Sequence, residues 1–176
     1  LSKISFKNNS EIFEIQKFNT FKDKQGELIK SPVFAIEEDR IGNIWVGYWK
    51  KGIAKLTFDK QSETYTSVNY QNQSNDTNSL SNNFVRDILE DSSGDIWVGT
   101  SSGLNKLKQD AAGNITFTSY LNEPENKNSL SNNYVLDAFQ SSDGDLYVGT
   151  FGGGLNQIDI SNNTLNFKHY TCYSLL

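Results

Sequence analysis

The stretch GDIWVGTSSGLNKLK, residues 94–108, is one of three copies of a repeat in this chain. A nearly identical copy, GDLYVGTFGGGLNQID, covers residues 144–159, and a looser copy, GNIWVGYWKKGIAKLT, covers residues 42–57. The repeat also extends backwards, because NSLSNNFV before the second copy matches NSLSNNYV before the third at a spacing of 50 residues. A constant period of this length indicates one supersecondary unit that is used repeatedly.

Each repeat reads as four short strands, because its apolar segments are rich in β-branched and aromatic residues and are bounded by Gly, Asn, Asp or Ser. In the second copy these segments are FVRDIL, DIWVG, LNKLK and ITFTSY. The first two are joined by EDSSGD, a tight turn in which Gly94 can take positive φ and Asp91 can cap the turn. Four antiparallel strands every 40 to 50 residues are the unit of a β-propeller.

The expected fold is therefore all-β: a β-propeller fragment of about three and a half four-stranded antiparallel blades. The second half of a blade plus a linker is expected at residues 1–32, and full blades at 33–83, 84–133 and 134–176. Leu1 is not preceded by Met, and the chain contains no Met, which predicts a piece of a longer protein. Bare terminal blades predict self-association, unless the missing blades of the full-length protein cover them.

Packing between blades explains why the copies resemble one another. Along a strand, side chains alternate between two faces, so Trp97 and Gly99 share one face. A blade lies between two neighbours, so both of its faces become buried and each copy must present the same surfaces. Large rings are expected to fill the space between sheets and glycines to allow close approach; the positions are Trp45, Trp97 and Tyr147, and Gly47, Gly99 and Gly149.

Composition excludes several function classes. The formal charge is −5 and no Lys/Arg block is present, so nucleic-acid binding is not expected. No apolar run is long enough to span a membrane, and no signal peptide precedes Leu1 in this stretch. One cysteine, Cys172, and one histidine, His169, permit neither an internal disulfide nor a His-rich metal site, and no cofactor is expected.

The pattern SLSNN-x-V, D-x-x-G-[ND]-[IL]-[WY]-V-G-T, G-L-N-x-[LI] and F-x-x-Y resembles the two-component regulator propeller repeat. This resemblance covers essentially the whole chain. It implies a periplasmic, seven-bladed propeller in the sensor region of a hybrid two-component system, which senses oligosaccharides and relays the signal to a histidine kinase. Tyr48 and Trp49 depart from the family pattern, as do Ser141 and the C-terminal TCYSLL.

Several motifs have a competing chemical interpretation. D-x-x-G-[ND] suggests a calcium loop, but an EF-hand supplies more oxygen ligands, and a hairpin turn is preferred. TFGGGLN at 150–156 has the glycines of a phosphate loop but lacks its helix and its Lys-Ser/Thr pair, so a tight loop is preferred. Trp45, Trp97 and Tyr147 could stack on sugars, although their repetition favours a core position.

Polar side chains of the repeats also have two interpretations. Asp87 and Asp137 occupy equivalent positions, so a carboxylate pair for glycoside cleavage must be weighed against ligand binding and structural hydrogen bonding. Ala35 stands at the same position in the first copy and breaks the set. His169 is expected in solvent, and the four asparagines of the repeated SNN are expected to satisfy backbone groups; these are Asn82, Asn83, Asn132 and Asn133.

A ligand site is expected where the variable loops YWKKG, TSSG and TFGGG meet the two NSLSNN segments, provided that the first strand of each blade is innermost. The candidate apolar partners are Tyr48, Trp49 and Phe151, and the candidate polar partners are Lys50, Arg86, Asp87 and Asp137. Packing between blades or subunits is an equal alternative for Trp49. Val85 and Ile88 are both apolar but three residues apart, so strict alternation leaves the orientation of this strand open.

The favoured function is an extracytoplasmic sensor module that binds a glycan and is not itself an enzyme. One alternative is a propeller enzyme that acts on polysaccharide, as a hydrolase or a lyase; it would need a convergent acid and base. The other is a purely structural or protein-binding propeller, which would show no stabilisation by a small ligand.

Overall fold

The computed structural model of the chain describes residues 2–6, 13–17, 29–161 and 164–170. These residues form strands joined by turns and loops, and they contain no helix that could cross a membrane. Cys172, the cysteine that permits no internal disulfide, lies outside them. The all-β fold predicted from the repeats is confirmed.

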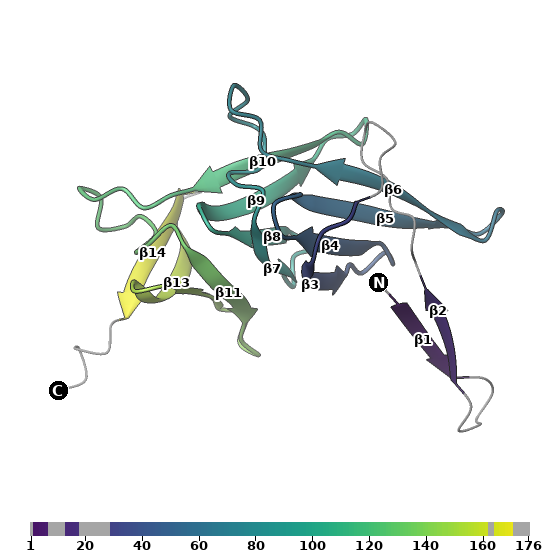
Figure 1. Cartoon of the computed structure of the whole chain (residues 1–176). Helices are drawn as coiled ribbons and strands as arrows, with labels where there is room; N and C mark the ends of the chain where they lie inside the picture. The colour runs from purple at the N-terminus through teal and green to yellow at the C-terminus, as the bar shows by residue number, and fades with distance from the viewer. Residues whose placement is uncertain (1, 7–12, 18–28, 162–163, 171–176) are drawn as a thin grey trace.

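Three four-stranded antiparallel sheets follow one another along the chain (Figure 1). The first blade consists of β3 (Val33–Glu38), β4 (Ile44–Tyr48), β5 (Ile53–Asp59) and β6 (Thr64–Tyr70). The second consists of β7 (Val85–Glu90), β8 (Ile96–Thr100), β9 (Gly103–Gln109) and β10 (Ile115–Tyr120). The third consists of β11 (Val135–Gln140), β12 (Leu146–Thr150), β13 (Gly154–Ser161) and β14 (Thr164–Tyr170).

The strands of each blade pair in chain order, and the blades meet through their first strands. β7 contacts both β3 and β11, which makes the first strand the innermost of each blade. Ahead of the blades, β1 (Ser2–Phe6) pairs antiparallel with β2 (Phe13–Lys17), as the two strands of a half blade would. The chain is thus an open propeller fragment, while the blade limits, including their loops, and the total of seven blades stay predictions.

The turn between the first two strands is held by one carboxylate. In the second blade, Oδ1 of Asp91 accepts the backbone N–H groups of Ser93 at 2.9 Å and Asp95 at 3.0 Å. Gly94 has a φ of 88°, in the left-handed region that favours glycine. The predicted hairpin turn and its Asp cap are confirmed, and the calcium-loop alternative receives no support from this geometry.

The same carboxylate also holds the buried tryptophan. Oδ2 of Asp91 accepts the indole N–H of Trp97 at 2.8 Å, and Oδ2 of Asp39 accepts that of Trp45 at 2.9 Å. Burial raises the pKa of Asp39, but hydrogen bonds from Asn43 and Trp45 outweigh it, so the pKa lies below its usual value. Each bond satisfies an indole N–H that would be costly to bury unpaired. Sequence reasoning predicted both residues but not the bond between them.

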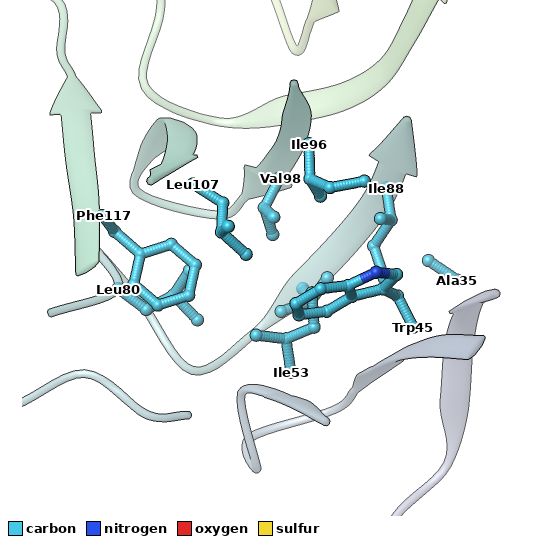
Figure 2. Close-up of a cluster of buried hydrophobic side chains, with 10 residues drawn as sticks. Ala35, Trp45, Ile53, Leu80, Ile88, Ile96, Val98, Leu107 and Phe117 are labelled. Atoms are coloured by element: carbon cyan, nitrogen blue, oxygen red, sulfur yellow. The ribbon is translucent and has the colours of Figure 1, made fainter. Parts of the chain in front are cut away.

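A hydrophobic core fills the space between the first and second blades (Figure 2). The Trp45 ring of β4, 2% exposed, lies near Ile53 of its own blade and Ile88 of β7. The cluster contains Ala35, Trp45, Ile53, Leu80, Val85, Ile88, Ile96, Val98, Leu107 and Phe117. Burying apolar area of this kind is the main favourable contribution to holding two blades together.

A second core repeats this arrangement between the second and third blades. Trp97 of β8 is 1% exposed and packs with residues of β11, β12 and β13. Its cluster contains Trp97, Leu104, Leu130, Val135, Leu146, Val148, Ile158 and Phe167. The prediction that Trp45 and Trp97 are core residues rather than sugar platforms is confirmed.

Tyr147, at the matching position in the third blade, is only half-buried. That it fills the space between two sheets stays a prediction, because no described blade covers that face. Ser141 also replaces the turn aspartate there, so the third blade has neither the carboxylate nor the indole N–H of the other two.

A glycine recurs at the same position in the second strand of each blade. In the first two blades it leaves a space, called here a socket, that a valine of the next blade fills. A Cβ at Gly47 would lie 2.5 Å from Cγ1 of Val85, and one at Gly99 would lie 2.6 Å from Cγ1 of Val135. A Cβ at Gly149 would meet no atom closer than 3.9 Å. In the two covered blades, the absence of a side chain therefore lets the next blade approach.

We expect Gly99→Ala to lower the free energy of unfolding by about 1 to 3 kcal/mol, because the new methyl overlaps Val135 in a filled core. Gly149→Ala is the matched control and should change stability by less than about 0.5 kcal/mol. Urea unfolding of both variants measures the difference. Equal destabilisation by the two substitutions would contradict the socket, and partial rescue of Gly99→Ala by Val135→Ala would support it.

Candidate ligand site at the loop face

Two kinds of loop meet on one face of the blades, called here the loop face. The residue after each second strand bonds to the backbone just ahead of the first strand: Trp49 N–H to Pro32 O at 2.9 Å and Phe151 N–H to Tyr134 O at 2.8 Å. In the second blade, Ser101 N–H donates to Phe84 O at 3.1 Å in the same way. The variable loops and the NSLSNN segments thus emerge together, as expected for innermost first strands.

The asparagines of the SNN segment hold this face in shape. Oδ1 of Asn82 accepts the backbone N–H of Phe84 at 2.8 Å, which is an Asx turn. The carbonyl of Asn83 accepts the N–H of Gly52 in the preceding blade at 2.8 Å. Asn132 and Asn133 make the equivalent bonds one blade later. The side chains of Asn83 and Asn133 also satisfy backbone groups, as the sequence predicted: their Oδ1 atoms accept the backbone N–H groups of Asn72 and Asn122.

A β-bulge at the start of each first strand turns one side chain toward the loop face. The register shifts between Val85 and Asp87, so Arg86 is the extra residue. The equivalent extra residues are Phe34 in the first blade and Leu136 in the third. A bulge interrupts strict alternation and re-aims a side chain, which explains why two apolar positions three apart are both buried here.

Five aromatic residues and one arginine lie close together on this face and are called here the mouth cluster. It consists of Phe34, Trp49, Phe84, Arg86, Tyr134 and Phe151. The ring centroids of Trp49 and Phe84 lie 4.0 Å apart, and those of Phe34 and Trp49 lie 5.2 Å apart. The three blades each contribute two members, so the group exists only in the assembled fold.

Arg86 lies at the centre of the mouth cluster. Its guanidinium carbon is 5.3 Å from the ring centroids of Phe34 and of Phe84, and 5.8 Å from that of Tyr134. These are cation–π distances, so rings from all three blades stabilise one positive charge. Phe151 packs on Tyr134 with centroids 5.7 Å apart and extends the cluster outward.

Parts of the mouth cluster remain open to solvent. The side chains of Trp49, Phe34 and Phe151 are 38%, 43% and 67% exposed. The mouth cluster thus combines partly exposed aromatic rings with a cation on one face of the blades.

Asp87 follows Arg86 and bonds between blades. Its Oδ2 accepts the backbone N–H of Ala138 in β11 at 2.8 Å. Burial raises the pKa of Asp87 to about 6; the bond from Ala138 opposes this change, and the negative charges of Asp137 and Glu37 add to it. Asp137, the equivalent residue of the third blade, is exposed.

The remaining predicted site residues lie elsewhere. Tyr48 is 2% exposed and packs with Val46, Ala54 and Leu56 in the first blade, and burial raises its pKa to about 12. This corrects the expectation of an available Tyr48 ring: β4 alternates, so the residue beside Trp49 points to the opposite side. Lys50 is exposed in the loop, with a φ of 63°.

The structure therefore brings together Trp49, Arg86 and Phe151, and places Asp87 beside them on the strand. Sequence reasoning missed Phe34, Phe84 and Tyr134, although the aromatic that ends both SNNF and SNNY was a visible signal. His169 is exposed as expected, with its Nε2 2.7 Å from the carbonyl oxygen of Ser129.

Three segments of the chain match a family model described as two component regulator propeller. The matched residues are 27–50, 79–102 and 129–152, one segment around the first two strands of each blade. No curated protein matches the sequence.

Several solved structures have a similar fold. The extracellular domain of the hybrid two component system BT3049 from B. thetaiotaomicron superposes with a TM-score of 0.70 at 24% identity, over 91% of this chain and 20% of that chain. The extracellular domain of BT4673 from the same organism superposes with a TM-score of 0.59 at 22% identity, over 81% of this chain and 19% of that chain. PorZ, a surface component of the type-IX secretion system of Porphyromonas gingivalis, superposes with a TM-score of 0.59 at 23% identity. The match covers 84% of this chain and 20% of that chain.

The chain thus spans about a fifth of the length of these solved chains. At identities below 25%, the likeness shows the fold: a run of propeller blades.

We expect Asp87 to make stability depend on pH. Its folded-state pKa of about 6 lies above the ordinary value of 3.8, so the folded state holds the proton more tightly. The stability that this protonation contributes is fully present below pH 3.8. As the pH rises through 6 it is lost, and the free energy of unfolding falls by about 1 to 3 kcal/mol. Asp87→Asn keeps the acceptor for Ala138 and should abolish the loss.

Urea unfolding between pH 4 and pH 7.5 measures this effect, with Asp143→Asn as a control for removing one exposed negative charge. A stability difference between wild type and Asp87→Asn that stays constant across this range would contradict the assignment.

Proposed function

Because the chain is built from two-component regulator propeller repeats, we propose that it belongs to the extracytoplasmic sensor region of a hybrid two-component system. In this proposal the mouth cluster binds an oligosaccharide signal. The signal is passed to a histidine kinase outside this chain, and the periplasm is the compartment expected for the propeller. The similar extracellular domains from B. thetaiotaomicron support this setting through their fold.

The mouth cluster is the observation that carries the ligand proposal. Trp49 and Phe151 offer partly exposed rings on loops that differ between otherwise repeated blades. The apolar face of a sugar ring packs on an aromatic face, and nearby polar groups then orient its hydroxyls. Variation confined to loops on a repeated scaffold is how such folds acquire specificity.

The origin of the cluster suggests how binding is relayed. Trp49 belongs to the first blade, Arg86 to the second and Phe151 to the third, so a ligand that touches all three depends on how the blades sit relative to one another. A ligand shifts an equilibrium only through different contacts in its two states. Small changes in blade packing supply such states and pass them to neighbouring domains.

The enzyme alternative receives less support from the geometry. Glycoside cleavage needs two carboxyl groups that face one substrate, one of them as an acid. Asp87 has a raised pKa, but its Oδ2 accepts the N–H of Ala138, and the exposed Asp137 belongs to the next blade. A structural or protein-binding propeller is the other alternative, and it predicts no effect of any sugar on stability.

We expect Trp49→Ala in the full-length sensor to weaken oligosaccharide binding at least tenfold, because a stacking ring is removed. Phe58→Ala is the matched control: Phe58 is 43% exposed, but it packs on Tyr65 at the outer strands. Calorimetry against maltotriose, xylotriose and trigalacturonic acid gives the affinity, and thermal unfolding gives the stability.

Trp49 also packs on Phe34 and Phe84, so the two measurements separate binding from folding. Unchanged affinity in a folded Trp49→Ala variant would rule out this site. A lower unfolding temperature with no ligand dependence in either protein would favour the packing role for Trp49.

A further inference from the structure

Arg86, at the centre of the mouth cluster, forms no ion pair with another residue that the structure describes. The chain contains two arginines, Arg40 and Arg86. Arg40 forms an ion pair with Glu90, in which Nε lies 2.8 Å from the carboxylate. Among the described residues no such pair includes Arg86, and its buried Nε has no hydrogen-bond partner. A buried donor without a partner is costly, so this one calls for an explanation.

The nearby carboxylates do not supply that partner. Asp87 accepts the backbone N–H of Ala138, and Oε1 of Glu37 accepts that of Glu90 at 3.2 Å. Both acidic groups are thus used to join adjacent first strands. The chain keeps a guanidinium on its loop face although its net charge is −5 and several acids lie on the same strands.

The rings around Arg86 supply no negative charge to pair with its guanidinium. Phe34, Phe84 and Tyr134 lie at cation–π distance from the guanidinium and contain no anionic group. A guanidinium presents its five N–H donors in the plane of the group, and a carboxylate accepts two of them side by side. Trp49 packs on the same two rings, Phe34 and Phe84, that contact Arg86.

We propose that Arg86 binds the carboxylate of an acidic sugar, such as a uronic acid, whose ring stacks on Trp49. This inference rests on the proposed function and narrows its ligand to anionic oligosaccharides. Arg86 is partly buried and its Nε is fully buried, and a lower local dielectric strengthens a charge-assisted hydrogen bond at this place.

The test uses the full-length sensor and matched pairs of probes. Trigalacturonic acid is compared with its methyl ester, which keeps the ring and removes the charge, and a hyaluronan tetrasaccharide is compared with xylotriose. We expect the acidic probes to bind at least tenfold more tightly. Arg86→Gln should remove this preference, so that acidic and neutral probes bind with similar affinity, whereas Arg40→Gln should keep it.

The outcomes separate this inference from the proposed function. Equal binding of acidic and neutral probes by wild type would overturn the role of Arg86 and leave the oligosaccharide site standing. Binding of no probe at all would overturn both. A lower unfolding temperature in Arg86→Gln, together with weaker binding of every probe, would show that Arg86 joins the blades instead.

Discussion

Burial of sheet faces between neighbouring blades is the constraint on which this structure depends. Each blade has two apolar faces and can cover neither by itself, so the packing surfaces must recur in every copy. Trp45 and Trp97 supply the bulk, and Gly47 and Gly99 supply the space into which the next blade inserts a valine. The period of the sequence is a consequence of this packing.

The same constraint explains why polar residues repeat with the apolar ones. A buried indole needs an acceptor for its N–H, and the turn aspartate supplies it while it also caps the hairpin. The third blade lacks the aspartate and the tryptophan together, which leaves no indole N–H unsatisfied there. Likewise, the SNN asparagines bind backbone groups within and between blades, so their repetition reflects folding rather than ligand binding.

Function then falls to the positions that the scaffold leaves free to vary. Phe34, Arg86 and Leu136 occupy the same bulge in three blades, and the cationic Arg86 stands where the other two blades have an apolar side chain. The loops after the second strands also differ between blades, and they carry Trp49 and Phe151. Because these side chains meet where three blades converge, a ligand of the proposed kind would be coupled to blade packing, which is the property that the proposed sensor needs.

The sequence by itself determined the all-β fold, the strands of each repeat, the turn cap at Asp91 and the buried state of Trp97. These features depend on local chemistry or recur in every copy, so one chain already contains several observations of each. Only the tertiary structure decided which residues form the site. The bulge at Arg86 breaks the alternation from which side-chain directions are predicted, and Tyr48 turns into its own blade. The mouth cluster joins rings from three blades, far apart in the chain, and no local pattern encodes that they meet.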